Sequence, residues 1–408
     1  MNLKSEQLDI DLNIVIDVDQ PLNIVSQNEL LFQILGKENC EIKKINDRNV
    51  FVYTNDKGRK IILLKKTITY LGGNGQHPVY KKRMQLPSWY KEIVYYCQQN
   101  KEYEVKFLGI YHYEGNIVFT EFIKDTYITK KMNNSAAHVY INDLYQASVN
   151  GLFHKIDSFN NHIVTINIDV LKEYLNESLE IRDDLFSVIE DFNAQFPFDQ
   201  WITAQYAIDY MYESGFSQWR QTEWAGWYLE CMFDQFIKER KIEHIVEYVG
   251  LIGKAQTDLD FDLLINESFY GDLKASSNTT NSVLLNDQTN LITAIETYDK
   301  FWYIIYSHET RKDKDFEDFP MTQYRAYKIQ EENANKDKDF DPYSYHNKMK
   351  HSVNFKNVII LELNKVNYKH ALEDFNQGVQ PDGNPRNPKF KISKKNIDNF
   401  IVYKYTSK

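Results

Sequence analysis

The stretch from Thr257 to Ser276 constrains the fold more than any other part of the sequence, because it places two strand patterns on either side of a polar turn. In its first half apolar residues stand at every second position, which is typical of a β-strand: Leu259, Phe261, Leu263 and Ile265. Residues 266–268 supply the turn, and a second apolar strand begins at Phe269. We therefore predict a β-hairpin within a larger sheet.

This hairpin gathers acidic groups and one lysine. Asp272 and Lys274 are two residues apart on the second strand, so their side chains project from the same face. Asp262, at the head of the first strand, is expected to lie beside them, and Asp260 is the alternative because the hairpin register is uncertain by one pair. Carboxylates are the hard oxygen ligands that Mg²⁺ prefers. A lysine beside them can orient or help to deprotonate a water and can offset phosphate charge.

The surroundings of the hairpin supply further elements. Upstream, residues 218–240 have the pattern of a helix on which Glu223, Glu230 and Asp234 share one side. Downstream, residues 287–298 are predicted to be helical and residues 301–306 to form an apolar strand. Hydrolysis through water is favoured over a covalent intermediate, since no recognisable nucleophile constellation stands near the hairpin.

The order helix, hairpin, helix, strand, with Asp262 followed by Asp272-Leu273-Lys274, resembles the PD-(D/E)xK nuclease superfamily over roughly residues 215–306. Two departures are that no proline precedes the first aspartate and that the second acid is Asp rather than Glu. The resemblance implies an α/β (α+β) fold whose core is a mixed sheet flanked by helices. By motif position Asp262 and Asp272 would bind Mg²⁺, Lys274 would position the water, and Glu230 would assist at the metal.

The chain as a whole looks like a type II restriction endonuclease of that superfamily. This resemblance implies Mg²⁺-dependent cleavage of double-stranded DNA at a short specific sequence, usually by a homodimer. It also implies a cognate DNA methyltransferase as a functional partner. Two alternatives stay open: a non-specific, repair or mobile-element nuclease with the same core, and a catalytically inactive DNA-binding protein.

The length of 408 residues allows two domains with well-buried cores. A switch to helical patterning between Thr165 and Asp169 suggests a strand-rich DNA-recognition domain over 1–166 and a nuclease domain over 167–408. The three cysteines are far apart in sequence, which favours a reducing cytoplasm over a disulfide framework. With no apolar run of membrane-spanning length, we expect a soluble, cytoplasmic protein.

The formal net charge of −10 hides a local excess of positive charge. Residues 57–91 contain lysines and arginines but no acid, which favours one basic face for DNA. Within that stretch a glycine-rich loop precedes interleaved aromatic and basic residues, and the alternative is a flexible turn before a solvated strand. A second basic patch is predicted near the C-terminus, although a solvated basic tail is as good an interpretation. The candidate DNA-contacting residues are Lys65, Lys66, Asn74, Gln76, His77, Tyr80, Lys81, Lys82, Arg83, Arg386 and Lys389.

Overall fold

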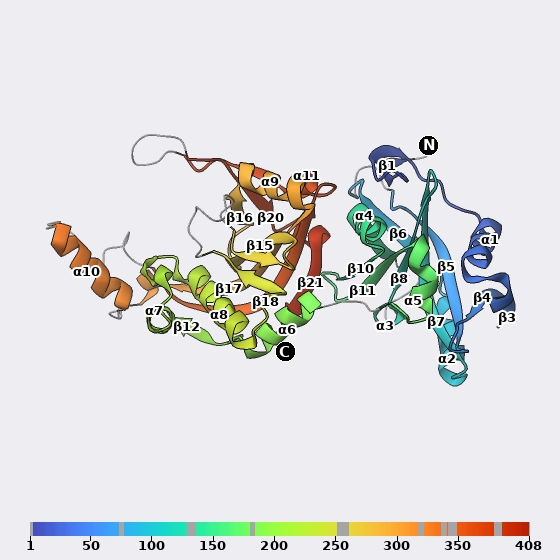
Figure 1. Ribbon diagram of the computed structural model, residues 1–408, viewed down its shortest axis with the longest axis horizontal. Helices are drawn as coiled ribbons and strands as arrows, with labels where there is room; N and C mark the ends of the chain where they lie inside the picture. The colour runs from blue at the N-terminus through green and yellow to red at the C-terminus, as the bar shows by residue number, and fades with distance from the viewer. Residues whose placement is uncertain are drawn as a thin grey trace. The chain divides into compact units, whose positions relative to one another are not determined.

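The computed structural model describes residues 3–72, 77–128, 136–179, 184–250, 261–316, 322–335, 341, 349–378 and 386–407. The chain forms two compact units, Met1–Arg182 and Asp183–Lys408 (Figure 1). The first unit extends past the boundary that we expected after residue 166. The reason is that helix α5 (Leu171–Leu175) buries Leu171 and Leu175 in the core of the first unit.

The first unit is built on a mixed sheet with the order β10-β11-β8-β7-β5-β4-β3, to which β6 and β9 are added through β5. Strand β5 runs parallel to β7 and antiparallel to β4, with which it forms a hairpin. The strands are β3 (Cys40–Ile45), β4 (Arg48–Thr54), β5 (Lys60–Tyr70), β6 (Lys81–Gln85), β7 (Tyr103–Tyr113), β8 (Asn116–Phe122), β9 (Ala136–Tyr140), β10 (Leu152–Ile156) and β11 (His162–Asn167).

This sheet is buried on both faces. On β5, Ile61 and Leu63 belong to one hydrophobic core, whereas Ile62 and Leu64 belong to the other, as the two-residue period of a strand requires. Helices α1 (Ile24–Leu35) and α5 pack into the first core, and α2 (Tyr90–Gln99) and α4 (Ile141–Asn150) into the second. A small hairpin of β1 (Lys4–Leu8) and β2 (Ile14–Val18) and the short helix α3 (Lys124–Ile128) complete the unit. Helix α4 begins at Ile141, directly after strand β9.

The second unit contains a mixed sheet with the order β12-β18-β17-β15-β14-β13, in which β21 also pairs with β18. Strands β15 and β17 run parallel, and the other pairs of described strands in this sheet are antiparallel. Its strands are β12 (Trp201–Thr203), β13 (Val246–Tyr248), β14 (Leu263–Ile265), β15 (Phe269–Ser277), β17 (Lys300–Lys312), β18 (Lys350–Asn364) and β21 (Ile401–Thr406). A smaller sheet joins β16 (Ser282–Asp287), β20 (Lys389–Ser393) and β19 (Glu373–Phe375).

Helices cover both sides of this sheet (Figure 1). Helix α9 (Gln288–Tyr298) links β16 to β17 on one side, and α6 (Asp184–Gln195) and α8 (Trp224–Arg240) lie on the other. Alternation along β17 explains the arrangement: Trp302 stacks on Phe186 of α6, while Tyr303 points the other way and bonds to Asn286 at the end of β16. The remaining helices are α7 (Ala204–Glu213), α10 (Gln323–Asn335) and α11 (Tyr368–Ala371).

Several predicted helices differ in extent. The pattern over residues 218–240 gives a 3₁₀ turn followed by α8. The helical patterning expected to begin between Thr165 and Asp169 gives α5 and α6, with residues 180–183 between them outside the described residues, and β12 and α7 follow. The helix and strand expected at 287–306 are confirmed as α9 and the first half of β17.

The predicted hairpin forms. Leu263 pairs with Gly271, and Ile265 pairs with Phe269. The turn contains Asn266 with φ 48° and Glu267 with φ 52°, both in the left-handed region that short polar residues adopt most readily. The first strand is shorter than expected, since β14 begins at Leu263 and residues 257–260 lie outside the described residues.

Both units combine sheets with helices, so the chain belongs to the mixed α+β class. Among the described residues, the helices are too short or too polar to cross a membrane.

The close approach of β15 to β17 generates a stability prediction. A Cβ added at Gly271 would lie 3.2 Å from the Trp302 carbonyl oxygen and 3.0 Å from Ile265 Cδ1. We expect Gly271→Ala to lower the free energy of unfolding by about 1–3 kcal/mol through overpacking. Gly226→Ala, in the interior of α8 with no atom within 4 Å of the added Cβ, should instead stabilise by about 0.5–1 kcal/mol. Urea denaturation measures both, and equal effects of the two substitutions would contradict the prediction.

Candidate carboxylate–lysine site and basic strand face

Strand β15 places an aspartate and a lysine side by side. Asp272 and Lys274 alternate with Leu273, so they share one face of the sheet, and their side chains form an ion pair. Asp272 is only 1% exposed, whereas the Lys274 side chain keeps 28% of its surface in contact with solvent. The lysine is therefore the member of the pair that a ligand can reach.

Asp262 joins this pair at the edge of β15, just before the point where β14 begins. Its Oδ2 accepts a hydrogen bond of 2.9 Å from the backbone N–H of Leu273, and its carbonyl oxygen accepts one of 2.8 Å from Val249. These bonds fix the aspartate across the hairpin from Asp272, as the sequence predicted. The alternative first aspartate, Asp260, lies outside the described residues.

Glu230 reaches the same place from helix α8. Its carboxyl is buried, and its Oε2 accepts a hydrogen bond of 2.6 Å from the Tyr248 hydroxyl on β13. The other two acids expected on this side of the helix have different partners, since Glu223 pairs with Lys350 and Asp234 with Lys238. Of the three helix acids, Glu230 is the one that interacts electrostatically with Asp272 and Lys274.

Two neutral side chains hold Asp272 from its own face of the sheet. Asn286 Nδ2 donates to Asp272 Oδ1 at 3.3 Å, and the Tyr303 hydroxyl donates to Asn286 Oδ1 at 2.9 Å. Tyr303 stands beside Asp272 in the parallel register of β15 and β17. Sequence reasoning missed Asn286, Tyr303 and Tyr248, because only the parallel pairing and the chain path bring them here.

The electrostatics of the site reflect three carboxyl groups around one ammonium. Burial raises the pKa of Glu230 to about 8, against the opposing effect of its bond from Tyr248, and the charge of Asp272 raises it further. Burial and the neighbouring charges of Asp272 and Glu230 raise the pKa of Asp262 well above its ordinary range. Burial lowers the pKa of Lys274, but the charges of Asp272 and Asp262 outweigh it and hold that pKa above its ordinary value. With all three carboxyls ionised, the site would carry more negative charge than one ammonium can offset, so a further cation would favour the ionised forms.

The donor chemistry of this site fits a divalent cation, since three carboxyl groups that interact electrostatically supply the hard oxygen ligands such an ion prefers. Gly250 leaves the space beside these groups open, because any larger residue at this position would place its Cβ 3.3 Å from Asp262 Oδ1 and 2.8 Å from the Tyr248 hydroxyl. Within the described ranges, however, no group of three or more His, Cys, Asp and Glu side chains is arranged to hold a metal ion.

In the first unit, strand β6 presents basic residues beside aromatic ones. Lys81 and Arg83 alternate with Lys82, and they pair in register with Tyr140 and His138 of β9. The Lys81 ammonium lies 5.6 Å from the centroid of the Tyr140 ring. The centroids of the Tyr80 and Tyr140 rings are 6.2 Å apart. Burial lowers the pKa of His138 to about 3, and the charges of Lys81, His77 and Arg83 add to the effect. We call Lys81, Arg83, His138 and Tyr140 the basic strand face.

Lys82 does not belong to this face. It is fully buried, and its ammonium bonds to Asp19 at 2.8 Å and to the Ser5 hydroxyl at 2.7 Å. Its role is structural, because the period of two turns every second residue of β6 into the protein. We therefore withdraw Lys82 from the predicted DNA-contacting residues.

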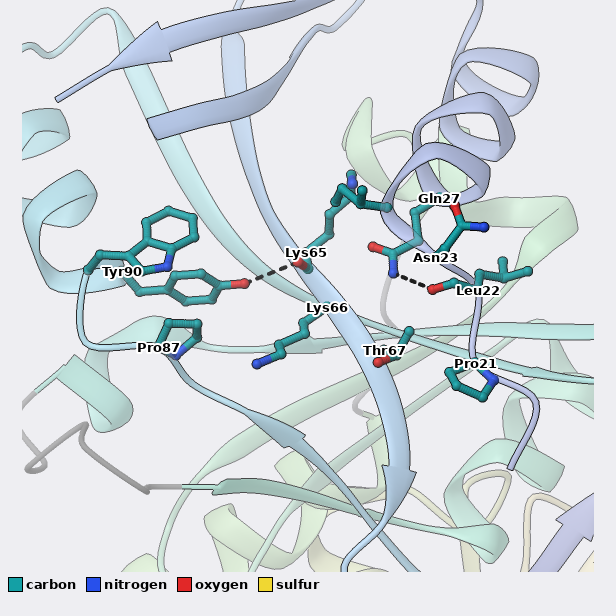
Figure 2. A pocket seen from close by; sticks show the side chains of 11 residues that line it. Pro21, Leu22, Asn23, Gln27, Lys65, Lys66, Thr67, Pro87 and Tyr90 are labelled. Carbon is teal, nitrogen blue, oxygen red and sulfur yellow. Dashed lines mark hydrogen bonds between the residues drawn. The ribbon is translucent and has the colours of Figure 1, made fainter. Parts of the chain in front are cut away.

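The acid-free stretch 57–91 is partly neutralised by acids that are distant in sequence. Lys57 and Arg59 both pair with Glu177, and Lys60 pairs with Glu102. The basic face that we expected is therefore smaller, because folding brings Glu177 and Glu102 beside the basic residues at the start of β5. Lys65 and Lys66, farther along β5, line a pocket beside α1 (Figure 2).

The remaining candidates are scattered. Asn74 and Gln76 lie outside the described residues. In the second unit Arg386 is exposed, with its backbone N–H bonded to the Gly378 carbonyl at 3.0 Å, and Lys389 begins strand β20. These two are not near the basic strand face in sequence, and they belong to a different unit of the chain.

Comparison with known families assigns part of the first unit. The family described as Methylase-associated X1 (MTaX1) matches residues 59–175, from the start of β5 to the end of α5. Its description suggests a restriction-modification context for this chain. No curated protein and no solved structure matches the sequence.

The two faces of β6 give a matched test of the basic strand face. We expect Lys81→Ala and Arg83→Ala each to weaken DNA binding several-fold and to reduce its salt dependence, with little change in thermal stability. Lys82→Ala should instead lower thermal stability and leave the affinity of the folded protein for DNA nearly unchanged, because it removes the buried ammonium that pairs with Asp19. Fluorescence anisotropy at several salt concentrations and thermal melts measure both effects. Equal losses of affinity in all three variants would contradict this division.

The raised pKa of Glu230 predicts how stability depends on pH without divalent cations. A carboxyl whose pKa is about 8 when folded and near its ordinary value when unfolded makes the folded state lose stability as pH rises between those values. In EDTA, Glu230→Gln should therefore raise the melting temperature of the second unit by roughly 3–10 °C at pH 8.5 and hardly at all near pH 4. Glu223→Gln, on the exposed start of the same helix, is the control and should show no such difference.

Proposed function

We propose that the protein is a type II restriction endonuclease that hydrolyses phosphodiester bonds of double-stranded DNA at a short specific sequence. The observation that supports this most strongly is the meeting of Asp262, Asp272 and Lys274 at the edge of β15, with Glu230 beside them. These are the residues that the resemblance to the PD-(D/E)xK superfamily identified from sequence. The helix α8, hairpin β14–β15, helix α9 and strand β17 also follow in the order of that superfamily's core.

Mg²⁺ is the proposed cofactor, held by Asp262, Asp272 and Glu230, and it would supply a Lewis acid for the phosphate and the leaving oxygen. Asn286 and Tyr303 keep Asp272 oriented toward the site through their hydrogen bonds. Tyr248 does the same for Glu230 from the other side. The chain's own contribution is therefore a set of carboxyl groups whose positions are decided before substrate arrives.

Lys274 acts as a cation in this proposal. Its raised pKa keeps the ammonium protonated at neutral pH, so it donates hydrogen bonds and cannot accept a proton. It would hold the attacking water and offset the charge of the phosphate oxygens. The proton of that water would then pass to solvent or to an ionised carboxylate of the site.

The first unit is proposed to bind DNA. Its basic strand face combines cations with aromatic rings, and the matched family's description places it in a methylase-associated setting. A cognate methyltransferase would protect the recognition sequence, and a homodimer would provide one site for each strand.

A catalytically inactive DNA-binding protein is the second candidate. It is favoured by the Asp272–Lys274 ion pair and by the lack, among the described residues, of a closed group of metal ligands. In that case the ion pair would replace the metal, and the second unit would have a structural role only.

A plasmid digest separates these possibilities. With Mg²⁺ and unmethylated DNA we expect discrete fragments from the wild type, and a loss of roughly 10²–10⁴-fold in rate for Lys274→Ala and Asp272→Asn. Lys365→Ala removes a solvent-exposed lysine–aspartate pair from the second unit and should cut normally. Gel electrophoresis over a time course measures the rates, and EDTA should abolish them.

Each other outcome of the digest has a definite meaning. A smear in place of discrete bands would indicate a non-specific, repair or mobile-element nuclease. Binding without cleavage on several DNA substrates would leave the inactive DNA-binding protein.

A further inference from the structure

A second site lies in the first unit, where a pocket of about 600 Å³ opens between α1, β5 and the segment that leads into α2 (Figure 2). Its polar wall is formed by Lys65, Lys66 and Thr67 of β5 and by Gln27 of α1, and its aromatic wall by Trp89 and Tyr90. The volume is within the range of small-molecule sites, and the mixture of an apolar wall with a few polar groups is typical of them.

Gln27 is the first indication that this pocket takes a ligand. Its side chain is 4% exposed, and its Nε2 donates a hydrogen bond of 2.8 Å to the Leu22 carbonyl. Its Oε1 is buried and has no hydrogen-bond partner among the described residues. Figure 2 shows this amide between α1 and β5, on the side of the helix that faces Lys65. A buried acceptor without a donor is unfavourable, and a ligand with an N–H group would satisfy it.

The two lysines are the second indication. Among the described residues no acidic side chain forms an ion pair with either Lys65 or Lys66, in contrast to Lys57 and Arg59 in the turn before β5 and to Lys60 at its start. Burial alone lowers the pKa of Lys65 to about 8, so this ammonium has lost solvent without gaining a counter-charge. An anion in the pocket would compensate both lysines.

The aromatic wall is held in place. The Tyr90 hydroxyl donates to the Lys65 carbonyl at 3.2 Å, and the Trp89 ring packs edge-on against Tyr90 with 4.7 Å between centroids. The guanidinium of Arg48 lies 5.7 Å from the Trp89 ring and adds a cation at this wall. A planar ring can stack on an indole held in this way, and such stacking is tolerant of sequence.

An anion site, an unsatisfied acceptor for an N–H group and an aromatic wall together match one class of ligand. We propose that this pocket binds a nucleoside 5′-phosphate, either free or as an unstacked nucleotide of a DNA strand. The phosphate contacts Lys65 and Lys66, the base lies against Trp89, and an N–H of the base is donated to Gln27 Oε1. The site belongs to the first unit, so it does not depend on the carboxylates of the second.

Calorimetric titration of the full-length chain in EDTA tests this proposal. The probes are the four deoxynucleoside 5′-monophosphates, deoxyadenosine, inorganic phosphate and a single-stranded octanucleotide. We expect nucleotides to bind more tightly than the nucleoside or phosphate alone. Lys65→Gln and Lys66→Gln should each weaken nucleotide binding by roughly tenfold. Gln27→Met should weaken binding of the nucleotides but not of inorganic phosphate.

Controls make the result specific to the pocket. Lys81→Gln, on the basic strand face, should leave the affinity for free nucleotides unchanged. Circular dichroism and thermal melts show whether each variant folds. Should a pocket variant unfold, competition between inorganic phosphate and nucleotides on the wild type still tests whether they share a site.

The two possible sources of the nucleotide give different results. Binding of free monophosphates supports a diffusible nucleotide. Binding of the octanucleotide alone, weakened by the pocket variants, supports a nucleotide displaced from a strand, whereas octanucleotide binding that only Lys81→Gln weakens belongs to the basic strand face and would overturn the proposal. No binding of any probe at millimolar concentration, or affinities that the three pocket variants leave unchanged, would overturn the proposal. Lys274→Ala should bind nucleotides normally, so loss of cleavage and loss of this pocket's ligand can be told apart.

Discussion

The second unit depends on the parallel pairing of β15 with β17. This pairing sets Asp272 beside Tyr303, and through Asn286 it fixes the orientation of a carboxyl that is almost fully buried. A buried carboxylate is costly unless it is paired, and Lys274, two residues along the strand, provides the charge. Two further carboxyls at the same edge exceed what one lysine can neutralise, which accounts for the raised pKa values of Glu230 and Asp262.

In the first unit the sheet determines where the positive charges lie. Apolar residues of β5 pack into cores on both faces of the sheet, and Lys60 at the start of this strand pairs with Glu102. Lys57, Arg59 and Lys82 also form ion pairs with acids that are distant in sequence. Lys81 and Arg83 of β6 lie opposite Tyr140 and His138 of β9. The positive charge of this unit is thus concentrated into a strand face and a pocket, and both are suited to phosphate-bearing ligands.

Much of the candidate site in the second unit could be predicted from sequence because its chemistry is local. The period of two placed Asp272 and Lys274 on one face, and the short turn brought Asp262 across from them. Glu230 was predictable only as one of three acids on a helix, and the bond from Tyr248 distinguishes it from the other two. Asn286 could not be foreseen, since its contact with Asp272 depends on a separate sheet and a parallel crossover.

The sequence by itself determined the alternation of strands and helices, the hairpin and the local excess of positive charge, because each follows from the spacing of neighbouring residues. Only the tertiary structure decided which charges remain available and which are paired. Lys82 looks like its neighbours in sequence but bonds to Asp19, sixty-three positions away, while Lys65 loses solvent without gaining an acid. Burial and pairing are properties of segments that fold together, and local spacing does not encode them.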